Sequence, residues 1–203
     1  MTKTVLTALI LMLASVTAQA AGNPENGQSL SEGCQGCHGV DGNSPVGMWP
    51  SLAGQSYNYL VKQIHDFKNG IRKDETMEPM VTGLSDQDVA DISAYFSSQK
   101  AIATGTVSDE GLVTLGQKIY KGGNHESKLM ACAGCHGANA QGNDAAKFPS
   151  LVGQQSEYTM IQMQNFASGA RNNDMNNMMK DIANRMSSKE MEAVSAYLAT
   201  LSQ

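Results

Sequence analysis

The sequence is poor in aromatic residues and cysteine, and it has few long hydrophobic runs. Phe, Trp and Tyr make up only 5% of its 203 residues, which is thin for two separate hydrophobic cores. After residue 20, no segment approaches the roughly 20 apolar residues that a membrane-spanning helix needs, so we expect the rest to be soluble. Strand-like alternation of apolar and polar residues is scarce, which favours a helical fold.

Positive charge is scarce too. The chain has 14 Lys and Arg against 19 Asp and Glu, a formal net charge of −5. A nucleic-acid-binding protein needs a basic face, so we expect no nucleic-acid partner. The acidity lies mainly in residues 21–102, which carry ten acidic and five basic residues, whereas residues 103–203 carry nine and eight. An acidic first half suits steered encounter with a basic patch on a partner protein.

Residues 1–20 have the pattern of a cleavable export signal. Lys3 provides the positive start, residues 5–16 are almost uninterruptedly apolar, and residues 18–20 fit a small-x-small cleavage site. The apolar run is too short to span a bilayer, although an uncleaved anchor is the alternative. We therefore predict cleavage after Ala20 and a location in the periplasm.

All four cysteines fall in two copies of one motif, C-x-x-C-H, at residues 34–38 and 132–136. This is the attachment signature of c-type haem, in which two thiols add across the porphyrin vinyl groups and the adjacent His faces the iron. A thioredoxin-like redox pair, one structural zinc and two disulfides are the alternatives. The wide separation of the pairs and the lack of a strand–helix–strand pattern favour haem. We predict two covalently bound haem c groups, attached through Cys34, Cys37, Cys132 and Cys135.

The chain contains an internal duplication. Residues 50–55 (PSLAGQ) return as residues 149–154 (PSLVGQ), and several residues downstream recur at the same offset of 99. We predict an N-terminal domain over residues 21–102, a linker over residues 103–108 and a C-terminal domain over residues 109–203.

Helix start signals recur in both halves. Asn23 before Pro24 predicts a capped helix start, and Ser56 is predicted to cap a second helix. Capping boxes are predicted at residues 85–88 and 187–190. Apolar residues at helical spacing follow these boxes, so the predicted fold class is all-α.

The duplication restricts the iron ligands. His38 and His136 recur, whereas His65 and His125 have no counterpart, so the first two are the predicted axial histidines. A soft Met thioether as the sixth ligand raises the reduction potential and closes the site against oxygen or peroxide.

Several methionines could supply that thioether. Met77 lies seven residues before Leu84 and Met179 seven before Met186, two equivalent positions at the start of the last predicted helix of each half, and they are our predicted ligands. A different register leaves Met80 and Met178 as alternatives, and Met175 is a more distant candidate.

Two further recurring pairs have predicted roles. Pro50 and Pro149 lie where small c-type cytochromes place a carbonyl acceptor for the axial His, although plain turn prolines are the alternative. Arg72 and Arg171 could pair with haem propionates, with solvated surface arginines as the alternative.

The sequence resembles the dihaem cytochrome c4 family in five segments, at residues 33–44, 52–55, 84–88, 134–137 and 148–151. The resemblance covers nearly the whole chain after the signal. It implies two tandem class I cytochrome c domains, each wrapped around a His/Met-ligated haem, with Met77 and Met179 as the matching methionines. The Asn- and Met-rich stretch 172–179 departs from the family pattern.

The resemblance also implies a periplasmic electron carrier that associates peripherally with the membrane surface. Its redox partners would be a quinol-oxidising complex (quinol–cytochrome c reductase) and a terminal oxidase. We therefore expect a carrier rather than an enzyme. A dihaem peroxidase and a fixed electron-transfer subunit of a larger oxidoreductase are the competing hypotheses.

Overall fold

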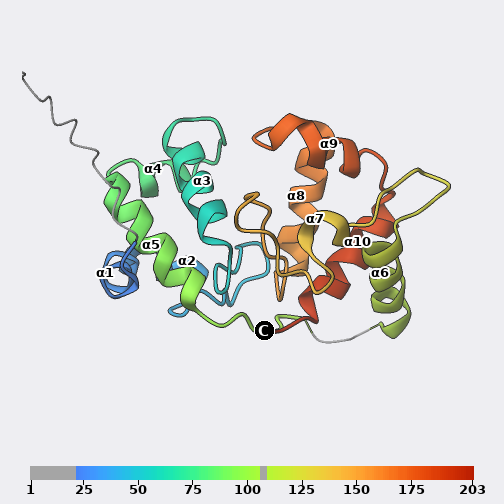
Figure 1. Ribbon diagram of the computed structural model, residues 1–203, viewed down its shortest axis with the longest axis horizontal. Helices are drawn as coiled ribbons and strands as arrows, with labels where there is room; N and C mark the ends of the chain where they lie inside the picture. The colour runs from blue at the N-terminus through green and yellow to red at the C-terminus, as the bar shows by residue number, and fades with distance from the viewer. Residues whose placement is uncertain (1–21, 106–108) are drawn as a thin grey trace, which may run out of the picture.

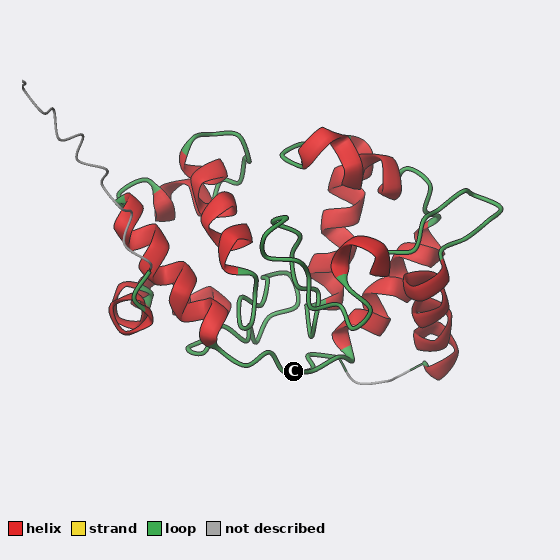
Figure 2. Cartoon of the chain, in the orientation of Figure 1, coloured by secondary structure: helices red, strands yellow, loops and turns green. Residues whose placement is uncertain are grey.

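The computed structural model describes residues 22–105 and 109–203, so the predicted signal and part of the predicted linker lie outside the described residues. Within the described part every regular element is helical, apart from two isolated β-bridges (Figure 2). No helix in that part is long and apolar enough to cross a bilayer. The fold is all-α, as predicted.

The helices form two side-by-side groups (Figure 1). The first group consists of α1 (Pro24–Leu30), α2 (Glu32–His38), α3 (Tyr57–Lys68), α4 (Met77–Val81) and α5 (Asp86–Ser98). The second consists of α6 (Glu110–Gly122), α7 (Ala133–His136), α8 (Ser156–Ser168), the 3₁₀ turn η1 (Met175–Asn177), α9 (Met178–Ala183) and α10 (Ser188–Ala199). The domain limits themselves stay predictions, because residues 106–108 are not described.

Local cap chemistry sets most of the predicted helix starts. The Asn23 side chain accepts from the N–H groups of Glu25 and Asn26, with Pro24 in the first turn. Both predicted capping boxes form, at Ser85 with Asp88 and at Ser187 with Glu190. The prediction that Ser56 caps α3 is wrong in its chemistry: Ser56 occupies the cap position without a capping bond, and its hydroxyl donates to the carbonyl of Phe148 in the other group.

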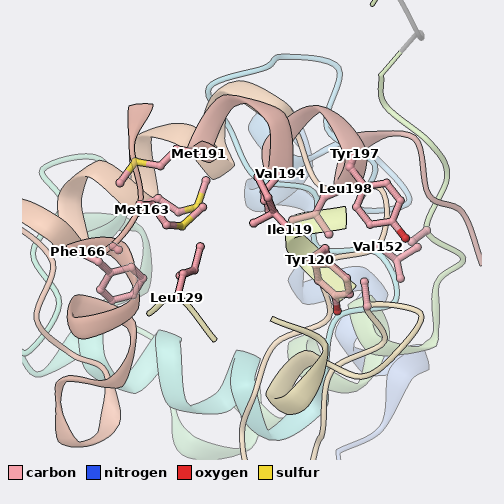
Figure 3. Packing of buried hydrophobic residues seen from close by; sticks show 14 of the residues in the cluster. Ile119, Tyr120, Leu129, Val152, Met163, Phe166, Met191, Val194, Tyr197 and Leu198 are labelled. Atoms are coloured by element: carbon pink, nitrogen blue, oxygen red, sulfur yellow. The ribbon is translucent and has the colours of Figure 1, made fainter. Parts of the chain in front are cut away.

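Each group packs its first helix against its last. In the second group, Ile119 and Tyr120 of α6 face Tyr197 and Leu198 of α10, which Figure 3 shows from close by. In the first group, the buried cluster is small and consists of Leu60, Ile92, Tyr95 and Phe96. A core of this size is modest for a domain of about 80 residues, so a buried cofactor would add the apolar volume that the side chains lack.

Glycine permits the close crossing of these helix pairs. A Cβ at Gly116 in α6 would overlap the backbone carbonyl of Ala193 in α10, and a Cβ at Gly27 in α1 would overlap the carbonyl of Asp91 in α5. The two crossings are therefore alike in the two groups, as expected for duplicated modules.

We predict that Gly116→Ala destabilises the protein by at least about 2 kcal/mol, because backbone rather than a flexible side chain occupies the space. Gly122→Ala in the last turn of the same helix is the control, since nothing lies within 4 Å of a Cβ there. It should be neutral or stabilise by up to about 1 kcal/mol. Chemical denaturation of both variants measures the difference, and equal stability would contradict the close crossing.

Candidate functional site

The paired cysteines lie on or beside a short helix that ends in histidine. Helix α2 carries Cys34, Cys37 and His38, and residues three and four apart share one helix face. In the second group Cys132 holds the N-cap position of α7, which ends at His136. Gly39 and Gly137 follow with φ of 85° and 82°, so the chain turns sharply after each His in a region that favours glycine.

The structure places both predicted axial histidines in the same hydrogen bond. His38 Nδ1 lies 2.8 Å from the Pro50 carbonyl oxygen, and His136 Nδ1 lies 3.0 Å from that of Pro149. A carbonyl has no proton to give, so Nδ1 must be the donor and Nε2 is left with its lone pair. The predicted role of the two prolines as acceptors is confirmed.

Burial keeps both imidazoles neutral. Both side chains are buried, and desolvation lowers the pKa of His38 and of His136, although the hydrogen bond to the proline carbonyl opposes it. A neutral imidazole is the form that binds a metal ion.

The first cysteine of each motif is partly buried. Burial raises the pKa of Cys34, and it raises the pKa of Cys132 to about 11. A redox C-x-x-C pair has a lowered thiol pKa, so the thioredoxin-like alternative does not fit. All four cysteines are free, and residues 22–105 and 109–203 contain no group of three His, Cys, Asp or Glu that could hold a metal ion. The disulfide and zinc alternatives are therefore not supported.

Apolar packing surrounds the cysteine motifs. Cys34 packs against the buried cluster of the first group, and Cys132 packs against that of the second. Haem c requires two thiols for attachment, a His with an available Nε2 and an apolar surface for the porphyrin, and each half brings these together.

Met77 and Met179 each lie in the short helix that precedes the last helix of their group. Met77 begins α4 and its N–H donates to Asp74 Oδ1 (3.0 Å), whereas Met179 lies in α9 and its N–H donates to Asp174 Oδ2 (2.8 Å). Both side chains are half-buried, and Met179 packs against the same cluster as Cys132.

The alternative methionines have different surroundings. Met80 is 50% exposed and Met175 is 51% exposed, so both face solvent. Met178 is half-buried and directly precedes Met179. The other two histidines do not join the site, because His65 lies half-buried within α3 and His125 lies exposed in a turn.

A polar cluster with approximate two-fold symmetry joins the two groups. Arg72 donates to Tyr158 (3.0 Å) and Gln162 (3.1 Å) across the interface, and Arg171 donates to Tyr59 (3.0 Å) and Gln63 (3.1 Å) in return. The alternative of solvated surface arginines does not hold, because both side chains make hydrogen bonds between the two groups of helices. Pairing with haem propionates stays a prediction.

Glutamines make a second reciprocal pair of contacts. Gln55 donates to the Ser150 carbonyl and accepts from the Ser150 N–H (2.9 and 2.7 Å), and Gln154 makes the same two bonds to Ser51 (2.9 Å each). The sequence repeat contains Gln55 and Gln154 but does not predict a role for them. The signal that could have pointed to them is the return of a glutamine at the end of the repeated segment.

Comparison with known proteins identifies the family. The cytochrome c family matches residues 24–100 and 113–202. The chain is 43% identical to cytochrome c4 of Stutzerimonas stutzeri over 99% of this chain and all of the relative. The crystal structure of reduced recombinant cytochrome c4 from Pseudomonas stutzeri superposes with a TM-score of 0.84 at 43% identity, covering 89% of this chain and all of the other.

A more distant relative carries another name. The thiosulfate dehydrogenase electron acceptor of Stutzerimonas stutzeri is 32% identical over 95% of this chain and 92% of its own length. Since both halves match cytochrome c and the nearly full-length relatives at 41–44% identity are cytochromes c4, this chain belongs to the cytochrome c4 family of dihaem c-type electron-transfer proteins.

Proposed function

We propose that this protein is a periplasmic one-electron carrier between a quinol-oxidising cytochrome complex and a terminal oxidase. In this proposal Cys34 and Cys37 attach the first haem, with His38 and Met77 as its iron ligands. Cys132 and Cys135 attach the second, with His136 and Met179. The observation that carries the proposal is the duplicated buried His, whose Nδ1 is committed to a proline carbonyl beside two free thiols.

The side chains divide the work between them. The haem iron supplies reversible one-electron chemistry when bound. The proline carbonyls fix the tautomer and direction of each imidazole and leave Nε2 able to bind a metal ion. The methionine thioethers would supply the second protein ligand of each iron, favour the reduced state and exclude oxygen and peroxide.

Backbone hydrogen bonds and burial support the choice of methionines. The Asp74 carboxylate accepts from the N–H of Met77 three residues on, and the Asp174 carboxylate accepts from that of Met179 five residues on. Met77 and Met179 are half-buried, whereas Met80 is 50% exposed. These features favour Met77 over Met80 as the ligand in the first half.

The location and partners rest on the sequence. Residues 1–20 have the pattern of an export signal, and c-type haem is attached outside the bacterial cytoplasm. The acidic first half would receive a basic partner surface, and association with the membrane surface would bring the carrier close to its partners.

A second candidate function has its own support. The relative named as a thiosulfate dehydrogenase electron acceptor favours a role as the electron-transfer partner of one oxidoreductase. Stoichiometric co-purification with such an enzyme would distinguish this role from that of a mobile carrier. Rapid peroxide turnover, or a high-spin ferric haem in the resting protein, would instead indicate the peroxidase.

A redox titration with optical spectra tests the proposed function. We expect two haems per chain, two one-electron steps and low-spin spectra in both oxidation states. One haem per chain, or a high-spin component that reacts with peroxide, would contradict the proposal.

We predict that Met77→His lowers the potential of the first haem by at least about 60 mV, a tenfold change in its reduction equilibrium, because imidazole favours ferric iron more than thioether does. The thioether–iron charge-transfer band of that haem should disappear. Met80→Leu is the control and should leave band and potential in place. Loss of the band in Met80→Leu instead would assign Met80 as the ligand.

We also predict that the first half attracts cationic redox partners. Its Lys62 pairs with Asp66, Lys68 donates to the Leu84 carbonyl and Arg72 lies in the interface, so few cations offset the exposed acids. The rate at which the cationic reductant hexaammineruthenium(II) reduces the ferric protein should fall at least about threefold between 0.01 and 0.15 M ionic strength, as screening shortens the range of the field.

Neutralised variants locate this effect. Glu32→Gln/Glu75→Gln in the first half should lower the low-salt rate, whereas the matched pair Glu110→Gln/Glu192→Gln in the second half should change it much less. All four glutamates are exposed. Equal effects of the two pairs would mean that only the overall charge matters.

A further inference from the structure

One peptide unit in each half connects the axial histidine to a glutamine of the other half. The Pro149 carbonyl that accepts from His136 Nδ1 and the Ser150 N–H that donates to Gln55 Oε1 belong to the same peptide group. The Pro50 carbonyl and the Ser51 N–H likewise link His38 to Gln154.

We propose that Gln55 and Gln154 are positioning residues that each tune the iron ligand of the opposite domain. Gln55 acts on His136, and Gln154 acts on His38. This inference rests on the proposed function, in which these histidines bind the two haem irons.

The geometry of the link leaves each glutamine one orientation. The side-chain N–H of Gln55 donates to the Ser150 carbonyl, and its side-chain oxygen accepts from the Ser150 N–H. The amide therefore pairs with both the backbone donor and the backbone acceptor of one residue. The same oxygen also accepts from the N–H of Ser56 at 2.9 Å. Gln154 repeats this arrangement with Ser51 and the N–H of Gln155.

Burial protects the hydrogen bonds of the two glutamines from competition by water. Gln55 is 6% exposed and Gln154 is 7% exposed, and Ser51, Ser150 and both histidines are buried as well. Solvent does not compete in such surroundings, and a peptide N–H that loses its acceptor there has no ready replacement.

Hydrogen-bond cooperativity predicts whether each glutamine raises or lowers the reduction potential of the opposite haem. A peptide whose N–H donates to a strong acceptor is more polarised, so its carbonyl becomes a better acceptor. A better acceptor at Nδ1 makes the imidazole more electron-rich, and an electron-rich axial ligand stabilises ferric iron. Removing the glutamine acceptor should therefore raise the potential of the haem in the opposite domain.

The experiment uses the full-length dihaem protein with Gln55→Leu. This substitution removes the hydrogen-bond acceptor and replaces it with an apolar side chain of similar size. We expect the second haem to become easier to reduce, with its reduction equilibrium shifted about two- to threefold, or roughly 20–30 mV at 59 mV per tenfold. The reduction equilibrium of the first haem should change by less than about 1.5-fold. Gln154→Leu should give the reverse pattern, with the shift on the first haem.

Asn58→Ala is the matched control. Asn58 also reaches across the interface, where its side chain donates to Asp144 at 2.7 Å. Unlike Gln55, it does not bond to the peptide group whose carbonyl accepts from an axial histidine. Its loss should move neither potential.

A second readout keeps the test independent of electron transfer. In the ferrous protein labelled with ¹⁵N-histidine, the Nδ1–H proton of His136 should move upfield in Gln55→Leu but not in Gln55→Glu, whose carboxylate is an even stronger acceptor. The Nδ1–H proton of His38 should move in neither variant.

The failing outcomes are distinct. Equal shifts of both haems, a shift confined to the first haem, or an unmoved His136 signal in Gln55→Leu would each overturn the inference while leaving an intact dihaem carrier. A wild-type protein without two low-spin haems would overturn the proposed function, and the inference with it.

Discussion

A single hydrogen bond, made once in each half, organises the site. The imidazole that follows each pair of cysteines donates from Nδ1 to the carbonyl of a proline 12 or 13 residues further along the chain. The bond decides the tautomer, aims Nε2 and holds the ring in a buried position where it stays neutral. The sharp turn at the following glycine and the loop that brings the proline back both serve this contact.

The interface between the halves has the character of a symmetric dimer within one chain. Arg72 reaches Tyr158 while Arg171 reaches Tyr59, and Gln55 reaches Ser150 while Gln154 reaches Ser51. Equivalent residues meet across an approximate two-fold axis, as they do in isologous interfaces of homodimers. Because these contacts are polar, buried and reciprocal, they fix the relative orientation of the two modules more specifically than apolar packing alone would.

Features decided within a few residues could be predicted from the sequence. The caps at Asn23, Ser85 and Ser187 formed as expected because their partners lie within the next helical turn. Likeness to small c-type cytochromes pointed to the proline carbonyls as acceptors, but the sequence alone left plain turn prolines open, and the structure decides for the acceptors.

Contacts between the halves could not be predicted, because they depend on which surfaces of the two modules meet. Ser56 has a good capping residue's chemistry, yet its hydroxyl donates to Phe148 of the other half. The sequence left open whether Arg171 would be a solvated surface residue, and the packing of the two halves places it against Tyr59. The repeat marked Gln55 as recurring but gave no means of naming its partner.

The most direct test of this account is a crystal structure of the haem-loaded protein with its iron atoms located by anomalous scattering. We predict two irons per chain, bonded to Nε2 of His38 and of His136, with each Nδ1 still within hydrogen-bonding distance of its proline carbonyl. An iron bonded to any other residue in place of these histidines, or a ring turned away from Pro50 or Pro149, would contradict it.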